Sequence, residues 1–154
     1  MAFEKTPRGT HGTNVPSFVT PVMKFMNNQM IKRFRRSEAS GKTMGMLVLT
    51  TVGAKSGQRR QSLLGSFPDG DGAWLVVASA GGATANPAWY HNLAAHPGEA
   101  QVEVGGKTLN VTATQLSGEE RDAAWRGVLA AQPRYAGYEK KTDRLIPVIR
   151  LTAS

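Results

Sequence analysis

The chain has 154 residues, of which 40% are apolar, and it contains no cysteine. This length fits one domain with one core, and the lack of cysteine excludes disulfides, thiolate metal sites and cysteine nucleophiles. The net charge of +8 is uneven, because residues 1–36 carry seven basic side chains and one acidic, whereas residues 37–154 carry twelve basic and ten acidic. The sequence therefore predicts a flexible basic N-terminal arm with an amphipathic helix over 1–36 and a nearly neutral domain over 37–154.

Several classes of protein are excluded by what the sequence lacks. No stretch approaches the ~18 uninterrupted apolar residues of a membrane-spanning helix, and residues 1–18 contain no apolar core of a signal peptide. We therefore expect a cytoplasmic protein. The three histidines have no metal-ligand spacing with carboxylates, so no metal is expected. A nucleic-acid partner needs basic residues on a folded face or a recognised motif, and because neither is visible we expect none.

The first predicted element is a basic amphipathic helix within residues 17–36. Its Met, Phe, Val and Ile side chains recur near helical spacing, and the Lys and Arg residues at its C-terminal end complement the helix dipole. The preceding residues, 1–16, are rich in Gly, Thr and Pro, and we expect them to be mobile or loosely packed. Two interpretations of the helix stay open. It packs its apolar stripe on the domain, or it binds an anionic membrane surface, which would make the protein peripheral on the inner face of the membrane.

The rest of the chain predicts about six strands, most of them joined as hairpins. They are expected over 45–52, 59–67, 73–79, 99–104, 107–116 and 145–151. Pro147, within the last of them, indicates an edge strand or a bulge. Because strands and helices do not alternate, a parallel sheet is disfavoured. A mainly antiparallel β fold with peripheral helices, an α+β barrel, fits best.

Three helical segments are expected among these strands. Asn86 would cap a short helix over 87–96. A capping box formed by Ser117 and Glu120 would begin a helix over 117–131. The polar segment 133–144 is expected to be a short helix or a loop.

The turn over 53–57, Gly-Ala-Lys-Ser-Gly, is followed by Arg59 and Arg60, so that three cations gather at one hairpin. The turn is not a nucleotide-triphosphate loop, because its lysine precedes the second glycine and a strand follows it. Glycines nevertheless let backbone N–H groups approach an anion, and Arg supplies a donor fork for phosphate or carboxylate. Strand alternation places the two arginines on opposite faces, so we expect one of them at the site. A solvated hairpin tip is the alternative.

Three blocks of the sequence are similar to the deazaflavin-dependent nitroreductase family, whose members are reductases that use coenzyme F420. The blocks are TTVGAKSGQRRQSLLGSF (50–67), VVASAGGATANPAWYHNLAAHP (76–97) and PRYAGYEKKTDRLIPVIRL (133–151). The resemblance implies a split β-barrel, which agrees with the predicted strands. It also implies hydride transfer from reduced F420, a deazaflavin with a phosphate and a polyglutamate tail, to a small electrophilic acceptor, namely an activated alkene, a quinone or a nitro-type compound.

The resemblance further implies which residues bind the cofactor. Lys55 and Arg60 match the residues that contact the phosphate and the tail, and the stretch 78–82 matches the segment that runs beside the deazaflavin ring. Asn86, Pro87 and Trp89 match the block that closes over the cofactor. The implied cofactor-binding residues are Lys55, Ser56, Gly57, Arg60, Ser62, Ala78, Ser79, Ala80, Gly81, Asn86, Pro87 and Trp89.

Tyr135 and Tyr138 lie three residues apart, on one face of a helix. The resemblance places them in the substrate pocket above the ring, and we expect them, together with Ser79, to be the catalytic residues that polarise the acceptor or protonate the product. Some family members carry a further aromatic residue just before the proline that corresponds to Pro133. This chain has Gln132 there, so the resemblance does not extend to the reduction of bicyclic nitroimidazoles.

Alternatives to these assignments stay open. One alternative is an FMN- or haem-binding split-barrel protein, in which Lys55 and Arg60 hold one phosphate or propionate. Another is a non-catalytic carrier of F420. In the alternative interpretation of the site residues, Trp89 only anchors its helix in the core, and Tyr135 and Tyr138 are amphipathic surface residues. Split barrels often pair through a sheet face, so a homodimer is also left open.

Overall fold

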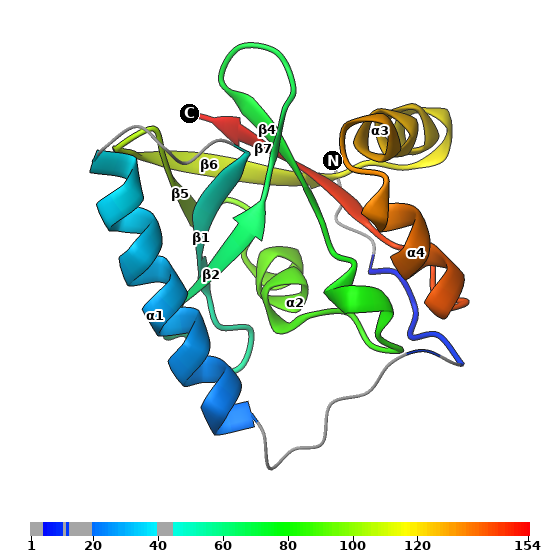
Figure 1. Ribbon diagram of the computed structural model, residues 1–154, viewed down its shortest axis with the longest axis horizontal. Helices are drawn as coiled ribbons and strands as arrows, with labels where there is room; N and C mark the ends of the chain where they lie inside the picture. The colour runs from blue at the N-terminus through cyan, green and yellow to red at the C-terminus, as the bar shows by residue number, and fades with distance from the viewer. Residues whose placement is uncertain (1–4, 11, 13–19, 40–44) are drawn as a thin grey trace.

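The computed structural model describes residues 5–10, 12, 20–39 and 45–154. In this part of the chain, seven antiparallel strands form one curled sheet with four α-helices around it (Figure 1). The strands are β1 (Met46–Val52), β2 (Arg59–Gly65), β3 (Phe67–Pro68), β4 (Ala73–Val77), β5 (Ala100–Val104), β6 (Lys107–Gln115) and β7 (Val148–Ala153). The helices are α1 (Thr20–Ala39), α2 (Ala88–Ala95), α3 (Gly118–Ala131) and α4 (Arg134–Lys141), with a 3₁₀ turn, η2, at Ala80–Gly82. The predicted fold class is confirmed.

The sheet curls because two consecutive strands lie at its opposite edges. The strand order is β2-β1-β5-β6-β7-β4-β3, and Ser66 alone separates β2 from β3. The prediction of one continuous strand over 59–67 is therefore wrong. Ser66 is buried and its N–H donates to the carbonyl of Gly45 over 2.8 Å, so that the pairing with β1 ends there and the pairing with β4 begins. This break accounts for the seventh strand.

Two apolar clusters hold the helices on the sheet. In the first, Tyr90 and Leu93 of α2 are fully buried against Leu47, Leu49 and other sheet residues. The second joins β4 and β7 to Trp125 and Val128 of α3 and to Tyr135 of α4. Removal of this apolar surface from water is the main contribution to the stability of such a fold, and it fixes α2 inside the curl of the sheet (Figure 1).

Three local predictions need correction. Pro147 does not mark an edge strand: β7 lies between β6 and β4, and the proline directly precedes it, where its missing N–H costs no ladder bond. Asn86 does not cap α2, whose N-cap is Pro87, because its amide is engaged in long-range contacts instead. Ser117 is the N-cap of α3 but forms no capping bond, and Glu120 contacts Arg150 rather than completing a capping box.

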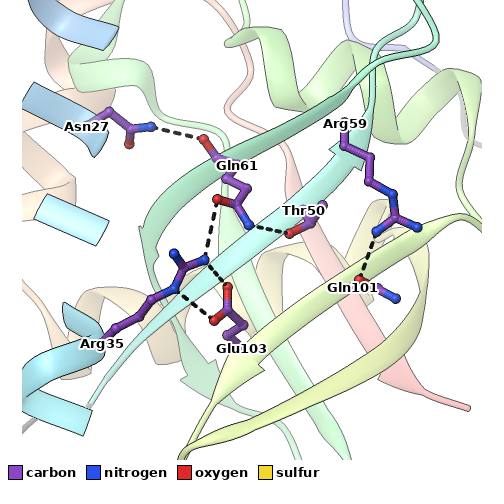
Figure 2. Close-up of polar contacts among 7 residues, drawn as sticks. All are labelled: Asn27, Arg35, Thr50, Arg59, Gln61, Gln101 and Glu103. Atoms are coloured by element: carbon purple, nitrogen blue, oxygen red, sulfur yellow. Dashed lines mark hydrogen bonds and ion pairs between the residues drawn. The ribbon is translucent and has the colours of Figure 1, made fainter. Parts of the chain in front are cut away.

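Helix α1 packs on the outer face of β1 and β2, largely through its C-terminal half. Ile31 and Phe34 are buried on Val48. Figure 2 shows that the guanidinium of Arg35 forms two bonds to the carboxylate of Glu103, at 3.0 and 2.8 Å. These contacts support the packing interpretation of the helix predicted over 17–36. Residues 17–19 lie outside the described residues.

Residues 5–10 of the N-terminal arm contact the domain. The N–H of Gly9 donates to the carbonyl of Thr84 over 2.9 Å, and the N–H of Thr10 donates to Asp143 Oδ1 over 2.7 Å. For residues 1–4, 11 and 13–16, the prediction of a mobile segment falls outside the described residues.

Candidate functional site

A cleft of about 1670 Å³ lies between α1, the β1–β2 hairpin and α2. Strand β2 is an edge strand, and residues from both of its faces line the cleft. Among the described residues, six Lys and Arg side chains and one carboxylate line it, namely Lys5, Lys24, Arg35, Lys55, Arg59 and Arg60, with Glu103. A concave surface with so large an excess of one charge favours a ligand of the opposite charge.

Two of these cations are already paired. Arg35 is held by Glu103, whose hydrogen bond raises the pKa of the guanidinium above its ordinary value. Arg59 Nη1 donates to Gln101 Oε1 over 3.1 Å (Figure 2). The described residues provide no hydrogen-bond or ion-pair partner for the other four, which are Lys5, Lys24, Lys55 and Arg60. The cleft therefore presents several unpaired positive charges, as an anion-binding site does before its ligand arrives.

The turn over 53–57 has the local geometry of an anion-binding loop. Gly53 N–H donates to the carbonyl of Gln58 over 2.7 Å, and Gly57 N–H donates to the carbonyl of Gly53 over 3.0 Å. Gly57 has φ of +69°, which favours glycine, and a Cβ at position 53 would lie 2.5 Å from Ser56 Oγ. Within the described part of the chain, the N–H groups of Lys55 and Ser56 have no acceptor. They are available to an anion beside the Lys55 ammonium.

Asn92 fixes this turn to α2. Its Oδ1 accepts a bond from Ala54 N–H over 3.0 Å, and its Nδ2 donates to Thr51 Oγ1 over 3.1 Å. The side chain is buried, so both bonds are shielded from water. Asn92 thus positions Lys55 relative to α2. It was not among the predicted site residues. A polar amide next to Leu93, in a helix whose Trp89 and Leu93 pack in the core, could have indicated a buried side chain with a specific hydrogen-bonding role.

Arg144 fixes the loop that follows β4. Its guanidinium is buried and donates to the carbonyls of Ala78, Ser79 and Ala83 at 2.8–3.0 Å, and to Asn86 Oδ1. Burial lowers the pKa of Arg144 from its ordinary value. Because Asn86 lines the cleft, Arg144 positions one wall of the site from a distance. The sequence analysis did not assign it a role, since nothing in its local pattern indicates burial.

The cleft brings together about half of the predicted cofactor-binding residues. Lining it are Lys55, Ser56, Arg60, Ser62, Asn86 and Trp89. Gly57 lies in the same turn but not in the lining, and Ala78, Ser79, Ala80, Gly81 and Pro87 lie in the adjoining loop held by Arg144. The side chains of Arg59 and Arg60 point to opposite faces of β2, as alternation requires. Both nevertheless line the cleft, because no described strand pairs with the outer side of β2.

Tyr135 and Tyr138 lie beside this loop but outside the lining of the cleft. Their rings meet edge to face, with centroids 5.4 Å apart. A Cβ at Gly82 would lie 2.9 Å from the carbonyl oxygen of Tyr138, so α4 packs directly on η2. A Cβ at Gly65 would lie 3.0 Å from Tyr135 Oη, so glycine at that position leaves room for the hydroxyl. The catalytic roles of the tyrosines and of Ser79 stay predictions.

Comparison with known proteins identifies the family. The family model for F420H(2)-dependent quinone reductase matches residues 26–153. The chain belongs to this family. It is 43% identical over 109 residues to the F420H(2)-dependent quinone reductase Rv1261c of Mycobacterium tuberculosis, an alignment covering 69% of this chain and 72% of that protein.

Two solved structures are also similar. The F420-H2 dependent reductase FDR-A is 42% identical with a TM-score of 0.63, and the match covers 70% of this chain and 93% of that one. A chain described as a domain-swapped dimer is 36% identical with a TM-score of 0.65, and the match covers 84% of this chain and 98% of that one. The resemblance and the split β-barrel fold are thereby confirmed. The protein is an oxidoreductase, an F420H2-dependent reductase whose cofactor is coenzyme F420.

Two further features of the described residues bear on the site. No group of three or more His, Asp or Glu side chains among them is placed to hold a metal ion. None of the described helices combines the length and the apolar character needed to span a bilayer.

Replacement of Arg144 tests its positioning role. Arg144→Met should lower the free energy of unfolding by about 2–6 kcal/mol, because the carbonyls of Ala78 and Ala83 lose this donor and each unsatisfied buried group costs about 1–3 kcal/mol, whereas the carbonyl of Ser79 still accepts a bond from Gly82 N–H. Arg144→Lys should restore only part of this loss, since one ammonium cannot reach all four acceptors. The measurement is urea denaturation. The control is Arg126→Met, at an exposed position of α3, which should shift stability by less than about 0.5 kcal/mol. Equal losses in the two Met variants would contradict the assigned role.

Proposed function

We propose that the cleft holds the phosphate and the polyglutamate tail of F420, and that the enzyme reduces a quinone-type acceptor. The observation that carries the first part is the set of unpaired cations around the glycine-containing turn. Their spread over several elements suits a ligand with several anionic groups. The second part is supported by the names of the relatives, which are quinone reductases. Activated alkenes and nitro-type compounds are further candidate acceptors, on the resemblance alone.

The residues present fit the cofactor. Lys55 and Arg60 would bind its anionic oxygens by charge-assisted hydrogen bonds, with the N–H of Ser56 and the hydroxyl of Ser62 beside them. Asn86 and Trp89 would form the wall next to them, held by Arg144 and by the core. When bound and reduced, the deazaflavin supplies a hydride, and the protein supplies binding, orientation and electrostatics. Tyr135, Tyr138 and Ser79 are proposed to donate a hydrogen bond or a proton to the acceptor.

The anion site is tested by titrating the protein with oxidised F420, with FMN as competitor. Lys55→Ala/Arg60→Ala should weaken binding by about 100-fold, because a hydrogen bond to a charged group contributes about 1.5–3 kcal/mol. The matched control is Lys107→Ala/Arg126→Ala, which removes the same charge at exposed positions outside the cleft.

Equal weakening in the two double variants would contradict a localised site. Preferential binding of FMN or haem would favour the alternative of a different split-barrel cofactor protein. Tight binding of F420 without reduction of any quinone, enone or nitroaromatic would favour a carrier.

The role of the tyrosines is tested by Tyr138→Phe and Tyr135→Phe. Each keeps the ring that packs in the second cluster and removes only the hydroxyl. If a hydroxyl polarises or protonates the acceptor, the kcat for a quinone should fall at least tenfold, since general acid catalysis contributes about 10²–10⁴-fold. The affinity for F420 should stay the same. Full kcat in the double variant would remove both tyrosines from the mechanism.

A membrane surface is proposed as a second partner, through α1. Val22, Phe25, Met26 and Met30 are 49–63% exposed, and their spacing of three and four residues places them on one face. Lys32, Arg33 and Arg36 lie on the same helix and are exposed. An exposed apolar stripe with adjacent cations is the pattern of a helix that lies in the interface of an anionic bilayer. A lipophilic quinone would be found in that bilayer.

Vesicle binding tests this surface. Phe25→Ser/Met26→Ser/Met30→Ser should weaken binding to anionic vesicles by about tenfold or more, and Lys32→Ser/Arg33→Ser/Arg36→Ser should remove the preference for anionic over neutral lipid. Arg35 is left intact because it holds α1 on Glu103. Leu145→Ser, at an apolar position that is 60% exposed elsewhere, is the control and should bind as wild type does. The proposal fails if both α1 variants also bind as wild type does.

The assembly of the protein is a separate proposal. The similarity to a chain described as a domain-swapped dimer supports a homodimer.

A further inference from the structure

Residues 5–10, here called the strap, are fixed on the loop and helix that border the cleft. Thr6 N–H donates to Tyr90 Oη over 2.8 Å, and Asn86 Nδ2 donates to the carbonyl of Thr6 over 2.9 Å. At the other end, Thr10 is bound to the carboxylate of Asp143 through its N–H and its hydroxyl. The strap therefore has defined contacts at both ends, with residues more than 75 positions away in the sequence.

Gly9 makes this close packing possible. A Cβ at that position would lie 2.6 Å from Asp143 Oδ1 and 2.9 Å from Arg144 Cβ. Both distances are shorter than any ordinary contact, so a larger residue would push the strap away. The backbone of the strap thus lies directly against the segment that positions the cleft wall.

The contacts of Thr6 bring Lys5 to the cleft. Lys5 lines it together with Lys55 and Arg60, and its ammonium has no partner among the described residues. Burial and then the positive charge of Lys5 lower the pKa of His91, which also lines the cleft. The neutral form of His91 is therefore favoured beside Lys5.

We propose that Lys5 is a further anion-binding residue of the F420 site, delivered by the strap. This inference rests on the proposed function of the cleft. The hairpin supplies Lys55 and Arg60, α1 supplies Lys24, and the strap supplies Lys5. A phosphate followed by a chain of carboxylates offers an anionic group to the cations of each of these three elements. The family match begins at residue 26, so this contact is a feature of the chain outside the matched region.

The test is equilibrium binding of oxidised F420, followed by its fluorescence, to wild type, Lys5→Ala and Arg8→Ala. Arg8 is an exposed cation of the same strap that does not line the cleft, so Arg8→Ala removes the same charge. Lys5→Ala should weaken binding about tenfold, Arg8→Ala less than twofold, and Lys5→Arg should restore most of the affinity. Binding to Lys5→Ala should also depend less steeply on salt than binding to wild type.

Three ligands distinguish whether Lys5 binds the phosphate or a glutamate carboxylate of the tail. They are F420 with its full tail, the form with the phosphate but no glutamates, and the deazaflavin without a phosphate. A defect of Lys5→Ala confined to the tailed form assigns Lys5 to a glutamate carboxylate. A defect with the first two forms assigns it to the phosphate. The same defect with all three forms overturns the inference, because it would not depend on an anion.

A second test uses Gly9→Val, which displaces the strap without changing Lys5. If the strap acts by delivering Lys5, Gly9→Val should weaken F420 binding to a similar extent, and the double variant Lys5→Ala/Gly9→Val should be little weaker than either single variant, because both remove the same interaction. Additive losses for tailed F420, with unchanged binding of the deazaflavin that lacks a phosphate, would overturn the inference, because displacement of Arg144 by Gly9→Val would then not explain them.

The outcomes also separate the inference from the proposed function. If wild type binds F420 and Lys55→Ala/Arg60→Ala weakens it, but Lys5→Ala behaves as Arg8→Ala does, the inference alone fails. If wild type does not bind F420, both fail.

Discussion

The site depends on one constraint of the backbone: β2 and β3 are separated by a single residue although they lie at opposite edges of the sheet. The chain can pass from one edge to the other through Ser66 only if the sheet curls until its edges approach. The curl encloses α2, and Leu93 and Tyr90 are buried there without exposed apolar surface. It also leaves β2 as a free edge. A cleft lined from both faces of one strand follows from this arrangement.

The basic residues of this protein fall into two physical classes. Arg35, Arg144 and Arg150 have their donors occupied by carboxylates or carbonyls, so they contribute to stability and position other groups. Lys55 and Arg60 have no such partner in the described part of the chain, and neighbouring like charges repel each other. An anion in the cleft relieves this repulsion as well as forming bonds of its own. Most of the excess charge lies in residues 1–36, because residues 37–154 are nearly neutral even with Lys55 and Arg60 included.

The sequence predicted most of the fold because its signals were local. The alternation of β5 and β6 and the turn at Gly105-Gly106 specify a hairpin within sixteen residues. The cofactor was implied by the combined resemblance of the blocks 50–67, 76–97 and 133–151 to a known family. What failed was set at long range. The end of β2 depends on Gly45, the amide of Asn86 is taken by Thr6 and Arg144, and Thr10 reaches Asp143 across 133 positions. No pattern within one element indicates such contacts, which is why the roles of Arg144 and of the strap were not predicted.

Helix α1 connects the two proposed surfaces of the protein. Lys24, Asn27 and Arg35 line the cleft from one of its faces, whereas Phe25 and Met30 are exposed. Among the described side chains of the helix, those with buried apolar contacts are Ile31 and Phe34, in its C-terminal half. A bilayer that binds the apolar face would therefore restrict the helix in the position that presents Lys24 to the cleft. If membrane binding stabilises this position of the helix, it strengthens the binding of the cofactor. By thermodynamic linkage, a bound cofactor then strengthens membrane binding by the same factor.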